Sequence, residues 1–116
     1  ILNETGGFAI RHAGIGEVGQ VEQYYRLNKA RSFEEWQAVM AMQAVPATNF
    51  VYADRAGHIA MVYNAKFPAR RPGFDWKGVL PGDTSQTLWT RYLPWRADPM
   101  VIDPSSGWVA NANNNP

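Results

Sequence analysis

The most regular pattern of apolar and polar positions along the chain lies in residues 32–46. It opens with Ser32 and Glu35, which have the spacing of a capping box, in which each side chain accepts a hydrogen bond from the other residue's backbone N–H. The apolar side chains that follow recur every three or four residues and make one face apolar: Phe33, Trp36 and Met40. Pro46 ends the run, because the residue before a proline disfavours the helical region. The pattern predicts a helix over about residues 33–44.

Two runs rich in β-branched and aromatic residues follow, over residues 49–54 and 58–63. The three residues between them include Gly57, which can occupy the positive-φ position of a short hairpin loop. The two runs predict a β-hairpin over about residues 49–63. Because apolar side chains stand at both alternate and intervening positions, we expect the hairpin to be covered on both faces.

The rest of the chain carries weaker patterns. A short strand is predicted at residues 8–11 and a helix at residues 20–30. Prolines recur between residues 67 and 104 and exclude long helices and central strands there, so we predict an ordered loop held by aromatic side chains. Residues 107–116 are predicted to close the chain with a strand, over 108–111, and an asparagine-rich turn.

The composition is that of a globular domain, with 46% hydrophobic and 18% charged residues and a formal net charge of +1. Basic and acidic residues are interspersed, so no nucleic-acid partner is expected, and no apolar run is long enough to span a membrane. The chain has no cysteine, which excludes disulfides and thiolate chemistry. Fifteen aromatic residues, mostly beside Gly, Pro and Asn, indicate a loop-rich surface. Because the chain opens in a candidate turn and closes in a dense polar motif, we expect an internal piece of a larger protein.

Most candidate reactive side chains have a simpler structural interpretation. His12 and His58 lie far apart, and neither has a His, Cys or carboxylate at metal-ligand spacing. Asp54 follows a predicted strand and is interpreted as a turn carboxylate. Arg70 and Arg71 could bind a substrate carboxylate, but adjacent arginines in a proline-bounded loop are more often solvated or structurally paired.

Two short stretches of sequence partly match known motifs. The string Gly14-x-Gly16-x-x-Gly19 matches the dinucleotide fingerprint, but no full strand and helix frame it and no acidic residue follows at the required distance. The string Ser105-Ser106-Gly107 lacks the first glycine of a nucleophile elbow, so we do not expect a serine triad of that kind.

The C-terminal segment packs four asparagines into five residues: Asn111, Asn113, Asn114 and Asn115. A carboxamide donates and accepts hydrogen bonds without ionising, so such a cluster can fix an irregular turn or donate to an oxyanion. Composition alone favours the turn.

The order of motifs resembles the penicillin acylase (penicillin amidase) branch of the N-terminal nucleophile hydrolases. Two blocks are the most specific: Asn49-Phe50-Val51-Tyr52-Ala53-Asp54-Arg55-x-Gly57-His58-Ile59 and Asp103-Pro104-x-Ser106-Gly107-Trp108-Val109-Ala110-Asn111-x-Asn113-Asn114-x-Pro116. The resemblance covers nearly the whole chain. Within the family, Leu80-Pro81-Gly82 and Leu88-Trp89 look more like relatives that hydrolyse acyl-homoserine lactones or other long-chain amides.

The resemblance implies an α+β fold, with residues 1–116 forming one internal fragment of the β-chain of a four-layer αββα enzyme with antiparallel strands. It implies hydrolysis of a linear acyl amide by a Ser at the β-chain amino terminus, whose own α-amine assists proton transfer. The oxyanion is then held by a backbone N–H and by an asparagine side chain, which the motif places at Asn113. This reverses the preference for a purely structural Asn113, whereas Asn111 and Asn114 keep a structural interpretation.

The nucleophile is not expected within these residues, because Ile1 is not a nucleophile and the four serines are internal: Ser32, Ser85, Ser105 and Ser106. We therefore expect the isolated chain to be inactive, to oligomerise, and to require the remainder of the acylase α- and β-chains as its partner. The alternative is a non-catalytic binding or interaction domain with the same fold. No cofactor is expected, since the family's structural calcium has a single candidate ligand region here, at Asp75 and Trp76. The resemblance also implies a periplasmic or secreted protein.

Overall fold

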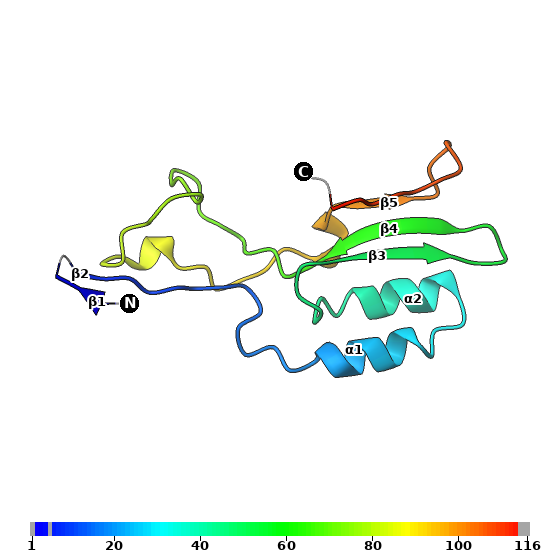
Figure 1. The fold of residues 1–116 in the computed structure, drawn as a ribbon, viewed down its shortest axis with the longest axis horizontal. Helices are drawn as coiled ribbons and strands as arrows, with labels where there is room; N and C mark the ends of the chain where they lie inside the picture. The colour runs from blue at the N-terminus through cyan, green and yellow to red at the C-terminus, as the bar shows by residue number, and fades with distance from the viewer. Residues whose placement is uncertain (1, 5, 114–116) are drawn as a thin grey trace.

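In the computed structural model, which describes residues 2–4 and 6–113, helices cover one side of an antiparallel sheet and a long excursion extends away from it (Figure 1). The described elements, in chain order, are β1 (Leu2–Asn3), β2 (Gly6–Gly7), α1 (Gln20–Leu27), α2 (Phe33–Met40), β3 (Thr48–Ala53), β4 (Ile59–Asn64), two 3-10 turns (Ser85–Thr87 and Trp95–Ala97) and β5 (Met100–Ile102). The principal extents are 59 × 30 × 23 Å. The fold is α+β, as predicted.

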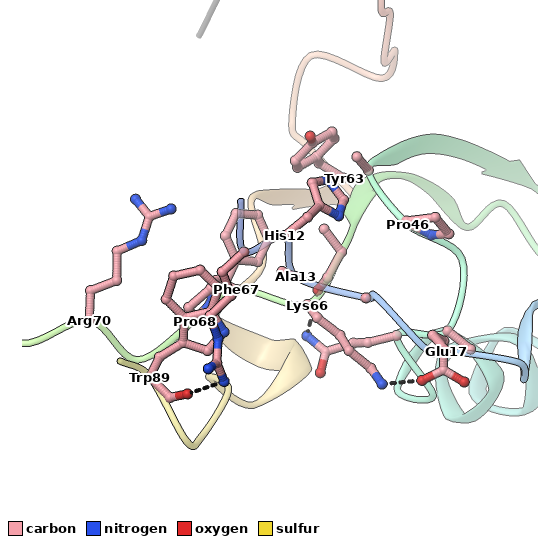
Figure 2. A pocket seen from close by; sticks show the side chains of 16 residues that line it. His12, Ala13, Glu17, Pro46, Tyr63, Lys66, Phe67, Pro68, Arg70 and Trp89 are labelled. Carbon is pink, nitrogen blue, oxygen red and sulfur yellow. Dashed lines mark hydrogen bonds and ion pairs between the residues drawn. The ribbon is translucent and has the colours of Figure 1, made fainter. Parts of the chain in front are cut away.

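The excursion over residues 67–93 is ordered by backbone pairing and by aromatic rings. Its two ends pair where Pro68 forms an antiparallel bridge with Tyr92, and the rings of Trp76 and Trp89 lie 6.2 Å apart. The N-terminal segment runs beside it but forms no strand at residues 8–11, so that prediction is wrong. Where this segment, the excursion, the end of β4 and the residues after α2 meet, they line an open cavity of about 240 Å³ (Figure 2).

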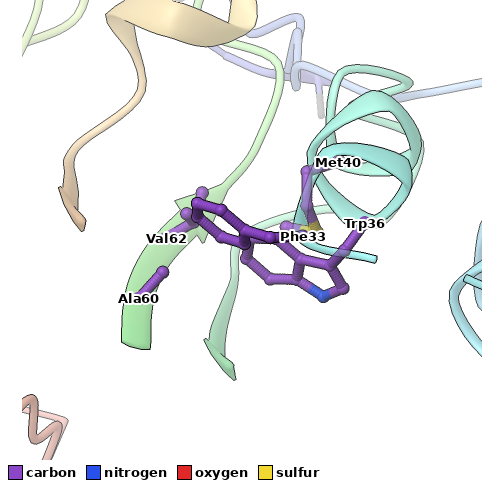
Figure 3. Close-up of a cluster of buried hydrophobic side chains, with 5 residues drawn as sticks. All are labelled: Phe33, Trp36, Met40, Ala60 and Val62. Carbon is purple, nitrogen blue, oxygen red and sulfur yellow. The ribbon is translucent and has the colours of Figure 1, made fainter. Parts of the chain in front are cut away.

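The hydrophobic core lies between α2 and β4 (Figure 3). It consists of side chains less than a tenth exposed: Phe33, Trp36, Met40, Ala60 and Val62. The three residues from α2 are those whose spacing defined its apolar face. Burying a side chain of this size stabilises the fold by about 1.5–3 kcal/mol relative to leaving it in water.

The sheet has the order β3-β4-β5, with every pair antiparallel. The hairpin prediction is confirmed, since β3 and β4 pair from Thr48↔Asn64 to Ala53↔Ile59 and Gly57 takes a φ of +97° in the loop. β5 is a three-residue edge strand inside the predicted proline-rich loop.

Only one face of the hairpin is covered. On β4 the buried residues alternate and face α2, whereas Val51 on the other face is 59% exposed. The expectation of a ribbon covered on both faces is therefore wrong for this chain, because the two helices lie on the same side of the sheet and no second layer is present among the described residues (Figure 1).

The capping box at α2 forms only in part. Ser32 Oγ accepts from Glu35 N at 3.2 Å, but the Glu35 carboxylate accepts from Arg31 N rather than from Ser32 N. The helix also ends at Met40 instead of residue 44, since Gln43 adopts a left-handed φ of +47°. Similarly, α1 ends three residues before the predicted residue 30.

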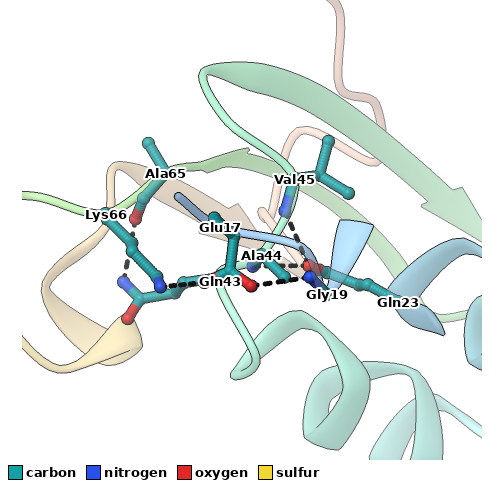
Figure 4. A network of polar contacts seen from close by, with 8 residues as sticks. All are labelled: Glu17, Gly19, Gln23, Gln43, Ala44, Val45, Ala65 and Lys66. Atoms are coloured by element: carbon teal, nitrogen blue, oxygen red, sulfur yellow. Dashed lines mark hydrogen bonds and ion pairs between the residues drawn. The ribbon is translucent and has the colours of Figure 1, made fainter. Parts of the chain in front are cut away.

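A buried glutamine explains the early end of α2 (Figure 4). Gln23 on α1 is fully buried, and its Oε1 accepts from the backbone N–H groups of Ala44 and Val45 at 2.7 and 2.9 Å. Its Nε2 donates to Asn64 Oδ1 at 3.0 Å, and Asn64 Nδ2 in turn donates to Met40 O. The residues after Met40 are thus held by α1 and β4, which joins both helices to the sheet.

Candidate functional site

Asn113 lies at the exposed C-terminal end of the described chain. Its backbone is left-handed, with a φ of +54°, and its N–H donates to Asn111 Oδ1 at 3.0 Å. No hydrogen bond holds its carboxamide within residues 2–4 and 6–113, which leaves that group available to a ligand. The strand predicted over residues 108–111 is wrong, because this segment is irregular and β5 occupies the edge of β4 instead.

Asn111 links this segment to the sheet. Its Oδ1 also receives a longer hydrogen bond, 3.4 Å, from Asn49 Nδ2 on β3. Side chains alternate along a strand, and Phe50 and Tyr52 pack toward the core beneath α2, so Asn49 belongs to the open face of the sheet. Asn113 is thereby tethered to that face. The remaining asparagines of the cluster, Asn114 and Asn115, lie outside the described residues.

The chemistry of Asn113 that bears on an oxyanion is the donation of a neutral N–H to a negatively charged oxygen. A carboxamide does this at any physiological pH because it does not titrate. It cannot supply an attacking group or a general base. A carboxamide in this position could therefore stabilise a developing negative charge, but a reaction would need an attacking group from elsewhere.

His58 is engaged elsewhere. Its Nδ1 lies 2.9 Å from Asp103 Oδ2, and its ring stacks on Phe33 with centroids 4.8 Å apart. The hydrogen bond to Asp103 raises the pKa of His58, against a smaller opposing effect of desolvation. The same bond lowers the pKa of Asp103. His58 closes the hairpin loop against the end of β5 and is not brought to the asparagine segment.

Asp54 satisfies the hairpin turn, as its sequence interpretation predicted. Its Oδ1 accepts from His58 N at 3.0 Å and its Oδ2 accepts from the Tyr52 hydroxyl at 2.9 Å. Desolvation raises the pKa of Asp54, but these donors and the nearby backbone outweigh it and the net pKa is lowered. The carboxylate is structural.

The cavity at the base of the excursion is lined by charged side chains that already have interaction partners within the chain (Figure 2). Lys66 forms a partly buried ion pair with Glu17, and this bond lowers the pKa of Glu17. Arg11 donates to Trp89 O at 2.7 Å and lies over the Trp89 ring. His12 lines the cavity without a metal-ligand cluster around it in the described part of the chain.

The paired arginines also serve the excursion. The Arg70 guanidinium lies 5.5 Å from the centre of the Trp76 ring, and the Arg71 carbonyl accepts from Trp76 Nε1 at 2.8 Å. Both residues anchor one tryptophan. This agrees with the structural interpretation of the pair.

Asp98, which the sequence did not single out, is buried between the 3-10 turn Trp95–Ala97 and β5. Its Oδ1 accepts from Gln43 Nε2 at 2.8 Å, while its Oδ2 has no partner among the described residues. Burial raises the pKa of Asp98, opposed by the hydrogen bonds from Gln43 and the Ala65 backbone. An aspartate between two short elements of a proline-rich stretch gives no local sign of such burial.

In the candidate calcium region, the Asp75 side chain and carbonyl both accept hydrogen bonds within their own turn. Asp75 Oδ1 accepts from Lys77 N within its own turn, and the Asp75 carbonyl accepts from Gly78 N. Calcium takes six to eight oxygens, and residues 2–4 and 6–113 contain no cluster of three or more His, Cys, Asp or Glu side chains placed to hold a metal. In the same residues no helix is long and apolar enough to cross a bilayer.

Comparison with known proteins gives a consistent result. The family model for penicillin amidase matches residues 1–116. The penicillin G acylase of Escherichia coli is 36% identical over 100 residues, which cover 86% of this chain and 12% of that protein. The acyl-homoserine lactone acylase QuiP of Pseudomonas fluorescens is 28% identical over 109 residues, 92% of this chain and 13% of the relative.

The structural comparison agrees with the sequences. A thermostable penicillin G acylase from Alcaligenes faecalis superposes with a TM-score of 0.74 at 29% identity, over 86% of this chain and 18% of the other. The chain therefore spans less than a fifth of the length of each of these proteins.

Proposed function

Because the chain belongs to the penicillin amidase family, we propose that it is an internal segment of an acylase β-chain and that the whole enzyme hydrolyses a linear acyl amide. In this proposal Asn113 is the oxyanion-stabilising side chain. The observation that carries it is the exposed, unengaged carboxamide of Asn113 at the end of a segment tethered to the sheet.

The chemistry follows from where charge develops. Attack on the amide carbonyl produces a tetrahedral intermediate with a negatively charged oxygen, and a fixed N–H donor stabilises that oxygen more than it stabilises the neutral carbonyl. In this proposal Asn113 is one such donor, and a backbone N–H from another part of the enzyme is the second. The attacking hydroxyl belongs to a β-chain N-terminal Ser, whose α-amine takes up the proton in place of a histidine.

The remainder of the enzyme has a structural role in this proposal as well. The open face of the sheet exposes Val51 and Val101, at 59% and 42%, beside the tether of Asn113. A second sheet packed on that face would complete the four layers of the fold and place the nucleophile opposite the carboxamide. The rest of the α- and β-chains is therefore the proposed partner, and the whole enzyme is proposed to be periplasmic or secreted.

The substrate class is an acyl amide in which the acyl chain and the amine can differ widely. The named relatives include acylases of penicillin G and of acyl-homoserine lactones, and both kinds of substrate present a secondary amide between an acyl group and a ring. We propose amide hydrolysis as the shared reaction, with the motif at residues 80–89 favouring longer acyl chains.

The alternative is a binding or interaction domain without catalysis. The two functions differ in what the whole protein does on maturation. An acylase of this type exposes a new amino-terminal Ser and releases amine from phenylacetyl and long-chain acyl amides. N-terminal sequencing of the purified whole protein and an amine-release assay on such a panel test this directly: an unprocessed chain without turnover of any amide would support the non-catalytic alternative.

A further inference from the structure

One side-chain oxygen connects the asparagine segment to strand β3. Asn111 Oδ1 accepts from the backbone N–H of Asn113 at 3.0 Å and from Asn49 Nδ2 at 3.4 Å. The first bond is local, between residues two apart, and the second spans 62 positions of sequence. A local turn is thus connected to the sheet through a single atom.

The local bond defines the backbone of Asn113. An asparagine oxygen that accepts from the N–H two residues ahead forms an Asx-turn, which replaces a backbone turn. Asn113 has a φ of +54°, a region that asparagine tolerates better than most residues but that still requires support from its surroundings. Since φ sets the direction of the Cα–Cβ bond relative to the chain, the turn also sets the direction in which the Asn113 side chain leaves the backbone.

The long-range bond fixes the turn relative to the fold. Asn49 is held in the β3–β4 ladder opposite Tyr63, so its carboxamide projects from a paired strand rather than from a loop. The residues between β5 and Asn113 have no strand pairing of their own. Asn49 therefore connects this irregular segment to a paired strand close to Asn113, the residue whose side-chain direction the proposed reaction depends on.

We propose that Asn111 is a positioning residue for amide hydrolysis, acting through Asn113, and that Asn49 anchors it to the sheet. This rests on the proposed function, in which Asn113 donates to the oxyanion. An oxyanion donor must lie about 2.7–3.1 Å from the position of the charged oxygen. A displacement of about 1 Å can cost on the order of 100-fold in rate, without weakening ground-state binding to the same extent.

Kinetics of variants in the whole enzyme test the proposal. Asn111→Ala removes the shared acceptor, and kcat should fall by about 10- to 100-fold with KM little changed. Asn111→Ser retains a hydroxyl oxygen that can accept from the N–H two residues ahead, so it should recover most of the lost kcat. Asn28→Ala is the matched control, since that exposed asparagine donates to Tyr24 O at the end of α1 and should leave kcat unchanged.

A double variant separates positioning from an independent contribution. If Asn111 acts only through Asn113, then Asn111→Ala combined with Asn113→Ala is no slower than Asn113→Ala alone. The positioning role would be overturned if the two rate losses multiplied in the double variant. It would also be overturned if Asn111→Ala kept the wild-type kcat while Asn113→Ala lost activity. Either result would leave the proposed function intact. A fully active Asn113→Ala would instead remove the proposed function.

A second variant allows the test even if Asn111→Ala does not fold. Should Asn111→Ala fail to accumulate as processed enzyme, Asn49→Ala removes only the anchor and keeps the local turn. It should lower kcat in the same direction but less than the loss of the turn, again with KM little changed. Unchanged kcat in Asn49→Ala would contradict the anchoring.

Discussion

The imidazole of His58 and the carboxylate of Asp103 lie 2.9 Å apart although 45 positions separate them in sequence. Asp103 also accepts from Ile59 N through its second oxygen, at 2.9 Å. The pair thereby joins the hairpin loop to the residue that follows β5. Asp54 and Glu34 face the same imidazole and favour its charged form.

This pair predicts a pH dependence of stability. His58 has a pKa above its usual 6.5, so its contribution is present below that value and is lost as the pH rises through the raised pKa. Asp103 has a pKa below its usual 3.8, so its contribution is present above that value and is lost as the pH falls through the lowered pKa. Thermal unfolding of the purified chain should show a Tm that declines as the pH rises above about 6.5, and His58→Gln should flatten this decline. An identical decline in the variant would contradict the account.

Gln23 predicts a large loss of stability on removal of one buried amide. In Gln23→Leu the N–H groups of Ala44 and Val45 and the oxygen of Asn64 lose their partner, and each unsatisfied buried group costs about 1–3 kcal/mol. We expect the free energy of unfolding, from urea denaturation, to fall by about 3 kcal/mol or more. Gln20→Leu on the exposed side of the same helix is the control and should change it little. Equal effects of the two substitutions would show that the network does not stabilise the fold.

The open sheet face predicts self-association of the 116-residue chain. Exposed apolar side chains on one face of a sheet favour association with another copy. Light scattering of the purified chain should therefore detect species above the 13.0 kDa monomer. Val51→Lys should shift the population toward monomer, whereas Gln86→Lys, exposed on the excursion, should not. A wild-type chain that remains monomeric at high concentration would argue against an exposed interface.

The same chain is predicted to be catalytically silent. In the proposed mechanism these residues supply only the oxyanion donor and a Ser from elsewhere in the enzyme attacks, so adding the purified chain to phenylacetyl or long-chain acyl amides should release no amine above background. Amine detection over several hours is sufficient to check this. Turnover by the purified chain, abolished by Asn113→Ala, would show that the nucleophile lies within these residues.

The features that could be predicted from the sequence are those governed by local interactions. The cap of Ser32 on Glu35 and the spacing of Phe33, Trp36 and Met40 locate the start and buried face of α2, because both depend on residues within a few positions of one another. The positive φ of Gly57 similarly follows from the length of the hairpin loop.

The features that could not be predicted depend on distant partners. The end of α2 is set by Gln23, about 20 positions upstream, and the edge of β4 is taken by Met100–Ile102 rather than by residues 108–111. A pattern of alternating residues does not specify which of two strand-forming segments reaches a free edge. At the candidate site, the resemblance to the family suggested Asn113, a role that stays a prediction, whereas the hydrogen bond between Asn111 and Asn49 required the three-dimensional arrangement.

The most direct test of the role of Asn113 is the steady-state rate of the whole enzyme with Asn113→Ala, on the amide that the wild-type enzyme hydrolyses fastest. Loss of one oxyanion donor lowers kcat by about 100- to 1000-fold, and KM should change little because the donor acts mainly in the transition state. The account predicts this loss in correctly processed enzyme, with Asn28→Ala at the wild-type rate. A correctly processed Asn113→Ala enzyme with wild-type kcat would contradict it.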